Sequence, residues 1–262
     1  MSIEEQIIQM NSNNKKIVDN SIAIYNKGVE DGEALGRKAE YNAFWDVAQE
    51  NGNRTNYAFA FSGDMWTQEN FKPKYPIRPV GSAHNMLAYW GQSYGGKGST
   101  RIDLRGICAF ELEKCTSINS MCYSNTYIKA IGILDTRNIN ALETVFSSAY
   151  NIETIEKIIL KDDGSQTFAN NFRYCEELTN LTIEGVIGQN GLNLQWSTKL
   201  SKNSWISIIN ALSTTTSGLT ITGSLASVKK AFETSAGAND GNTSAEWKAL
   251  TDTKTNWTIS LV

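Results

Sequence analysis

The sequence has very little histidine and proline, and its few cysteines form no short paired motif. It contains one histidine, three prolines and four cysteines among 262 residues. A single histidine excludes metal centres built from several imidazoles and leaves His84 as the one imidazole available as a base. No two cysteines form a Cys-x-x-Cys pair, which excludes a zinc ribbon and a thioredoxin-type redox motif. We therefore expect no metal, no cofactor and no catalytic site.

The sequence also lacks a long hydrophobic run and an excess of charge of one sign. No stretch approaches the roughly 20 apolar residues that a membrane span needs. The first residues are acidic and lack the basic and apolar segments of a signal peptide. With 24 basic and 27 acidic residues, the net charge of -3 does not favour nucleic acid or an anionic membrane as a partner. We expect a globular protein that is synthesised in the cytoplasm and has no membrane span.

Apolar residues near the start of the chain recur at a heptad spacing. The residues on this seam are Ile3, Ile7, Met10, Ile17 and Ile24. A narrow apolar stripe of this kind is typical of a coiled coil. The pattern predicts that residues 1–52 form a helical stem that mediates homo-oligomerisation. The alternative is a single surface helix packed on its own domain.

All three prolines lie in one short stretch, at Pro73, Pro76 and Pro79. Their period of three matches a polyproline II helix, which is extended and has no internal hydrogen bonds. Residues 53–100 are therefore predicted to be an aromatic, proline-containing connecting region. The alternative is that the prolines form a ligand for an aromatic groove on another protein.

The pattern apolar-x-x-apolar-x-apolar recurs in the remaining part, residues 101–262. Its copies are Ile128, Ile131 and Ile133; Ile155, Ile158 and Leu160; and Leu178, Leu181 and Ile183. Their offsets lie within the range of leucine-rich repeats, in which each unit contributes one short strand to a parallel sheet. Three of the four cysteines recur every seven residues, and we interpret them as small buried hydrophobic side chains.

Further strands and three helices are predicted in the same part. Strand cores begin at Ile102, Phe110, Leu192, Leu219 and Trp257, and helices are expected over residues 201–212, 224–232 and 244–250. Ser201 has the residue type expected for a helix cap. The expected fold class is α/β: an irregular leucine-rich-repeat solenoid of parallel strands and short helices, preceded by the helical, coiled-coil stem.

Residues between the apolar strand positions are expected to project outwards as a polar ladder. The candidate partner-binding residues are Asp103, Arg105, Lys157, Asn180, Thr182, Glu184, Thr220 and Thr222, and the ladder also includes Glu111, Ala130 and Thr258. Hydroxyl and amide groups in such a row can hydrogen-bond sugars or a polar protein surface. The alternative is that they only solvate the sheet.

The string Phe-x-x-Cys-x-x-Leu-x-x-Leu-x-Ile over residues 172–183 resembles the BspA-like class of leucine-rich repeat. The segments 200–212 and 218–222 are similar to a helix-strand unit that often closes such arrays in proteins of phages and prophages of gut bacteria. Residues 39–45, 51–55 and 71–75 resemble the segment that precedes those repeats. The resemblance covers about three quarters of the chain, from Ala39 onwards.

This resemblance implies a structural and receptor-binding protein of a phage virion, in a tail fibre or at a tail tip. The repeats would recognise a glycan or protein on the host cell, and the stem would contact other virion proteins as a homotrimer, by analogy with phage fibres. The alternative is a bacterial surface or secreted adhesin that binds a host or matrix protein. A glycan-processing enzyme is a remote alternative. His84 has no neighbouring carboxylate in the sequence, and the adjacent Asp162 and Asp163 are expected to lie in a turn with their side chains pointing apart.

Overall fold

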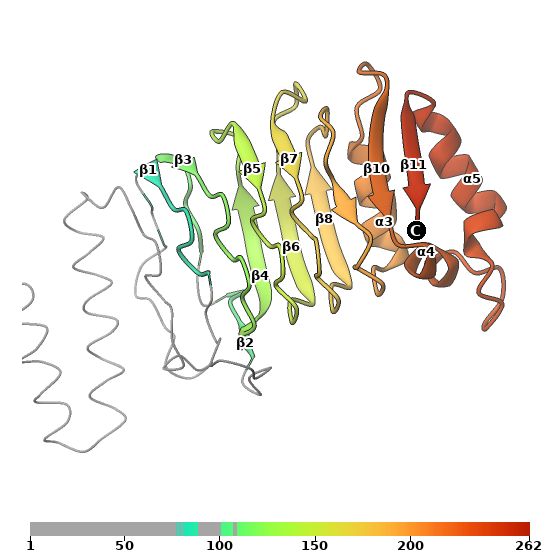
Figure 1. Ribbon diagram of the computed structural model, residues 1–262, viewed down its shortest axis with the longest axis horizontal. Helices are drawn as coiled ribbons and strands as arrows, with labels where there is room; N and C mark the ends of the chain where they lie inside the picture. The colour runs from blue at the N-terminus through green and yellow to red at the C-terminus, as the bar shows by residue number, and fades with distance from the viewer. Residues whose placement is uncertain (1–76, 78, 80, 89–100, 107–108) are drawn as a thin grey trace, which may run out of the picture.

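The computed structural model describes residues 77, 79, 81–88, 101–106 and 109–262 (Figure 1). The predicted stem, with Ile3, Ile7, Met10, Ile17 and Ile24, lies outside the described residues, and so does most of the predicted connecting region. The described part is a mixed α/β structure with several sheets and a few short helices. Its strands lie side by side in Figure 1, and the helices gather near the C-terminal end.

The longest sheet has the strand order β2-β4-β6-β8, and its strands are parallel. The strands are β2 (Ile102–Asp103), β4 (Ile128–Asp135), β6 (Thr154–Ile159) and β8 (Asn180–Glu184). Ile131 pairs with Ile155, which pairs with Leu181, and all three side chains are buried. The predicted strands at these repeats are therefore confirmed, and their apolar residues form continuous rows in the core.

Shorter strands form three further parallel sheets. Two of them are pairs: β1 (Gly81–Ser82) with β3 (Cys115–Ser117), and β5 (Ala141–Glu143) with β7 (Thr167–Ala169). The third has three strands in the order β11-β10-β9. These are β9 (Asn193–Leu194), β10 (Leu219–Gly223) and β11 (Trp257–Leu261). Ile77 also forms an isolated parallel bridge to Phe110. We call each successive segment of the chain that lies alongside its predecessor in these parallel sheets a coil, including the segments that carry β1 and β9.

The predicted burial is wrong at two positions of β4, Ile133 and Ala130. Ile133 was expected in the core but is 48% exposed, and Leu134 is buried in its place. The reason is that β4 places two residues between the buried Ile131 and Leu134, whereas β8 has only Thr182 between its buried Leu181 and Ile183. The register between β6 and β8 shifts at the corresponding point. Ala130, expected to project outwards, is 1% exposed.

Successive coils turn at residues in the left-handed conformation. Equivalent corners lie at Asn85, Ser120, Thr144 and Asn170, with φ between 52° and 56°. A second corner lies four residues later in three coils, and includes Tyr174 at φ 61°. Side chains of ordinary residues disfavour this region by about 1–2 kcal/mol, and asparagine tolerates it best. The packing of neighbouring coils therefore holds the threonine and tyrosine in a conformation that their sequence does not favour.

Buried amide side chains join neighbouring coils. The Asn171 side chain accepts a hydrogen bond from the Val145 N–H (2.9 Å) and donates one to the Leu142 carbonyl (2.8 Å). Asn125 donates to the Leu87 carbonyl (2.7 Å) in the same way. Both side chains are completely buried. Buried backbone groups that lack a partner are costly, so these amides complete the hydrogen bonding where the strands stop.

Rings and thiols fill the core between the sheets. Phe146 stacks on Phe172 with ring centroids 5.9 Å apart. The buried Cys175 thiol donates to the Phe146 carbonyl (3.0 Å), and burial raises the pKa of this thiol and of Cys122. The three described cysteines are buried, as predicted, and Cys108 lies outside the described residues.

The three predicted helices are confirmed. They are α3 (Lys202–Ala211), α4 (Leu225–Ala231) and α5 (Ala245–Thr251), accompanied by the 3₁₀ turns η1 (Gly241–Thr243) and η2 (Asp252–Lys254). Each α-helix has a serine at its N-cap, whose hydroxyl accepts a backbone N–H from the first turn. Such caps stabilise a helix start by about 1 kcal/mol.

Helix α3 lies along β8, the last strand of the four-stranded sheet. The Ser204 hydroxyl accepts the Leu181 N–H (2.9 Å) and donates to the Thr179 carbonyl (3.0 Å). Ser207 likewise accepts from the Ile183 N–H (2.8 Å) and donates to its carbonyl (3.1 Å). The two serines therefore supply the hydrogen-bond partners that another strand would provide. The edge of β8 is covered in this way, so its backbone groups are not available for pairing with another chain.

A buried lysine fastens the last turn of α3. The Lys254 ammonium donates to the carbonyls of Asn210 (3.1 Å) and Leu212 (2.6 Å), and the residue is 6% exposed. Carbonyls at the end of a helix lack partners within the helix, so a cation there is favourable. Burial disfavours the charged amine and lowers the pKa of Lys254 below its ordinary value of 10.5.

We expect Asn171→Ala to lower the free energy of unfolding by about 2–4 kcal/mol, because it leaves a buried N–H and a buried carbonyl without partners. Urea titration measures this change. The control is Asn138→Ala, which removes an exposed amide with one long contact (3.3 Å) and should change stability by less than about 0.5 kcal/mol. Equal effects of the two substitutions would contradict the role of the buried amides.

Lys254→Met should lower stability at pH 7 by about 1–2 kcal/mol, because two helix carbonyls lose their donor. Between the lowered folded pKa and 10.5, the unfolded chain binds more protons than the folded chain, so this lysine makes stability rise with pH. The deficit of the variant should therefore grow as pH increases towards 10.5 in urea titrations at several pH values. Lys248→Met, at an exposed position of α5, is the control, and a deficit independent of pH would contradict the burial argument.

Candidate functional site

The predicted partner-binding residues do not form one ladder. The sheet β2-β4-β6-β8 carries Asp103, Lys157, Asn180, Thr182 and Glu184, and Arg105 follows β2 directly. The other two, Thr220 and Thr222, lie on β10 in a different sheet. The expectation of a single continuous face was wrong, because α3 lies beside β8, the last strand of the first sheet, whereas β10 pairs with β9 and β11 in a separate sheet.

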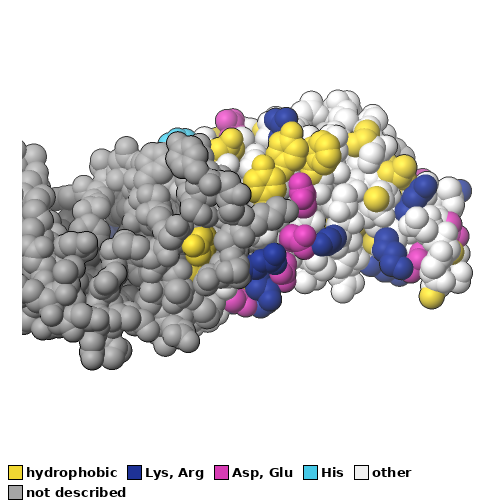
Figure 2. Space-filling view, turned by 60° about the horizontal axis from the view of Figure 1, so that its bottom comes forward, with side chains coloured by type: hydrophobic (Ala, Val, Ile, Leu, Met, Phe, Trp, Pro, Cys, Tyr) yellow, Lys and Arg dark blue, Asp and Glu magenta, His cyan; other side chains and the backbone are white. Residues whose placement is uncertain are grey.

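The charged members of the first group are paired with one another. The Arg105 guanidinium lies 2.6 Å from the Asp103 carboxylate, and the Lys157 ammonium lies 2.8 Å from that of Glu184. The Arg105 hydrogen bond lowers the pKa of Asp103. Charged side chains of both signs lie side by side in Figure 2. Exposed ion pairs of this kind contribute little to stability, and they leave no excess charge for attracting a ligand.

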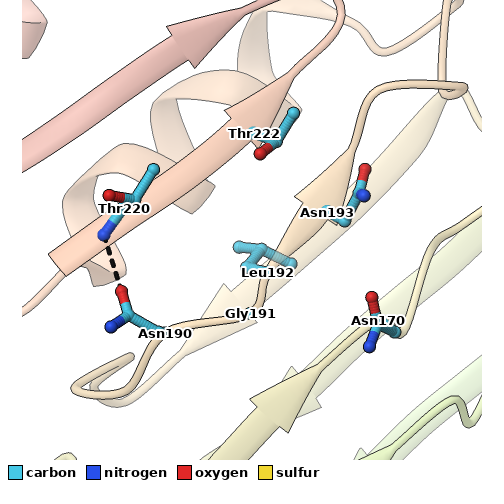
Figure 3. A pocket seen from close by; sticks show the side chains of 7 residues that line it. All are labelled: Asn170, Asn190, Gly191, Leu192, Asn193, Thr220 and Thr222. Carbon is cyan, nitrogen blue, oxygen red and sulfur yellow. Dashed lines mark hydrogen bonds between the residues drawn. The ribbon is translucent and has the colours of Figure 1, made fainter.

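The second group lines a hollow in the surface (Figure 3). The hollow has a volume of about 290 Å³, and its lining residues are Asn170, Asn190, Gly191, Leu192, Asn193, Thr220 and Thr222. The two threonines project from β10 because the alternate residues Leu219 and Ile221 are buried. Thr220 and Thr222 are thus the predicted site residues that line a hollow together with other polar groups.

The hollow lies where two sheets meet without continuing into each other. Strand β7 belongs to one sheet and β9 to the next, and the Asn170 N–H donates to the Gly191 carbonyl (2.8 Å) between them. Gly191 has φ 109°, and a Cβ at this position would lie 2.8 Å from the Cβ of Ala169. Only glycine allows this conformation and this close approach. The floor of the hollow is therefore backbone and the buried Leu192.

Two of the three asparagines in the hollow are held in a defined orientation. The Asn190 side-chain oxygen accepts the Thr220 N–H (2.7 Å), and the Asn193 side-chain oxygen accepts the Gln195 N–H (3.0 Å). Their NH₂ groups remain as donors. Within the part of the chain that the structure describes, no protein group hydrogen-bonds to the Asn170 side chain or to the hydroxyls of Thr220 and Thr222. The hollow thus presents several neutral donors and acceptors to solvent.

An aromatic row is a second surface feature, and the sequence reasoning missed it. The rings of Tyr150 and Tyr174 stack with centroids 6.5 Å apart, and those of Tyr174 and Trp196 with centroids 5.2 Å apart. The Arg173 guanidinium lies 4.9 Å from the centre of the Tyr174 ring, and Trp196 is 40% exposed. Figure 2 shows a short row of hydrophobic side chains on one face of the described part. The sequence signal that could have predicted this row is the recurrence of aromatic residues at Tyr150, Tyr174 and Trp196, in consecutive coils.

The residues considered for catalysis are dispersed. His84 is exposed, and its backbone N–H donates to the Ser82 hydroxyl (3.3 Å). The Asp163 carboxylate accepts the Ser165 N–H (2.9 Å), and this contact lowers its pKa. Residues 162 and 163 lie in a turn, as the sequence indicated. Among the described residues, no group of three histidine, cysteine, aspartate or glutamate side chains could hold a metal ion.

Comparisons with protein-family models, with curated proteins and with solved structures find no match for this chain. No described helix is long and apolar enough to cross a membrane.

Gly191→Ala should lower the free energy of unfolding by about 2–4 kcal/mol, because the new Cβ meets Ala169 and the backbone has a positive φ. Chemical denaturation measures the loss. The matched control is Gly237→Ala, which also has a positive φ but open space around the new Cβ, and we expect a loss of about 1 kcal/mol there. A loss at Gly191 no larger than that of the control would show that the coils can separate at the hollow.

Proposed function

We propose that this chain is a receptor-binding protein of a phage virion, located in a tail fibre or at a tail tip. Its C-terminal part is an irregular leucine-rich-repeat solenoid that recognises the host cell surface. The BspA-like string over residues 172–183 supports this proposal, because it supplies the buried Phe172, Cys175, Leu178 and Leu181 of one coil. The repeated corners and the buried amides between coils also agree with a solenoid.

The hollow at the junction of β7, β9 and β10 is the observation on which the proposed function depends most. It collects three asparagine amides and two threonine hydroxyls at an open surface. Groups that already hydrogen-bond within a protein add little to recognition, whereas groups that face solvent can exchange water for a ligand. Binding of a polar surface ligand is therefore the activity that this arrangement supports best.

In this proposal the heptad residues of the stem assemble three copies and attach them to other virion proteins. Several weak sites on one stem can hold a surface together with high avidity. The chain acts as a binder, and we propose no catalytic residue and no cofactor. The second candidate is a bacterial surface or secreted adhesin that binds a host or matrix protein. It is favoured by the aromatic row, since tyrosine, tryptophan and arginine are enriched where proteins bind each other.

Antibodies raised against the chain should label the tail tips or fibres of purified phage particles in electron micrographs. Antibodies that label bacterial envelopes and no particle would contradict the virion proposal and favour the adhesin. The control is pre-incubation of the antibodies with the pure chain, which should abolish the labelling.

Light scattering of the intact chain provides a second measurement on the same question. We expect a trimer, and we expect a monomer after deletion of residues 1–28, because the heptad seam is then lost. A strictly monomeric protein, unchanged by the deletion, would overturn the oligomeric stem.

A further inference from the structure

We infer that the hollow lined by Asn170, Asn193, Thr220 and Thr222 binds an uncharged sugar unit. This inference deepens the proposed function, because it names the chemical class of the surface receptor. It rests on the chemistry of the lining residues, on the orientation of their amides and on the size of the hollow (Figure 3).

The lining of the hollow contains no ionisable side chain. The outward residues of the neighbouring β11, Thr258 and Ser260, are neutral as well. A carboxylate, phosphate or ammonium group that leaves water needs an opposite charge or several strong hydrogen bonds. The hollow offers no opposite charge, so charged ligands are disfavoured and neutral polar ligands are selected.

The hydrogen-bonding groups match a ligand that both donates and accepts at many points. Asn190 and Asn193 each present an NH₂ donor, because their oxygens are occupied by backbone N–H groups. The Thr220 and Thr222 hydroxyls can donate or accept. A sugar ring carries hydroxyl groups with the same dual character on neighbouring carbons. Because the two amides are already oriented, little conformational entropy is lost when they bind.

The size and the polarity of the hollow favour a sugar over a peptide. Its volume of about 290 Å³ is at the lower limit of small-molecule sites, which is sufficient for a single ring. Peptides that are recognised through their side chains usually place apolar groups in pockets. The one large apolar lining residue, Leu192, is 1% exposed and offers no such pocket.

The test uses ligand-observed NMR with the full chain and a fixed set of probes. The uncharged probes are glucose, galactose, mannose and N-acetylglucosamine, and the charged probes are glucuronic acid and N-acetylneuraminic acid. We expect saturation transfer to at least one uncharged probe, with a dissociation constant on the order of 1 mM, and none to the charged probes.

The double variant Thr220→Val/Thr222→Val removes both hydroxyls and keeps the side-chain shape and the strand preference of β10. We expect it to weaken binding of the uncharged probe by about 10-fold or more. The matched control is Thr258→Val, which pairs with Thr220 on the adjacent strand and does not line the hollow, and it should bind as the unaltered chain does. Thermal melting verifies that both variants fold.

Three results would overturn the inference: no transfer to any uncharged probe, stronger binding of the charged probes, or loss of binding in Trp196→Ala but not in the double variant. The last result would place the ligand on the aromatic row. These failures are distinguishable from failure of the proposed function. Phage tails that are labelled by antibody while no sugar binds leave the function intact and exclude this ligand, whereas sugar binding without virion labelling excludes the function alone.

Discussion

The hydrogen bonding of one coil to the next is the constraint on which this structure depends. Each strand is short and parallel to its neighbours, so no coil can satisfy its own backbone groups or bury its own apolar face. Where the strands stop, buried amides such as Asn125 and Asn171 continue the pairing. At the last strand of the four-stranded sheet, serines of α3 take over. The same constraint explains why even Thr144 and Tyr174 adopt a left-handed backbone, since the corners of successive coils must coincide.

The hollow lies where this hydrogen bonding between successive coils is interrupted. Between β7 and β9 the pairing is reduced, and Gly191 lets the backbones approach closely. The outward asparagines and threonines of two strands then face a space that no side chain fills. On the first sheet, in contrast, Asp103 pairs with Arg105 and Lys157 pairs with Glu184, so these charges neutralise one another. A receptor site is therefore better supported at the junction of the sheets than on the regular face.

Much of the secondary structure was predictable because it depends on local patterns. The three helices were predicted over 201–212, 224–232 and 244–250, the first with Ser201 as its cap, and the strands at Ile155 and Leu181 were predicted from the repeat. The pattern failed at Ile133, since an extra residue in β4 changes which side chains point inwards. The aromatic row was also missed, because stacking joins residues from three different coils.

The sequence by itself determined the kinds of groups available: a single histidine, abundant hydroxyls and amides on strand positions, and an apolar repeat that must stack to bury its core. Only the tertiary structure decided which of these groups meet. Thr220 and Thr222 join Asn170 across about fifty residues because parallel coils place equivalent positions side by side. Thr182 and Glu184 lie on β8, whose neighbour is α3 and not β10. The spacing within a repeat is local, whereas the place where one sheet ends and another begins depends on the packing of whole coils.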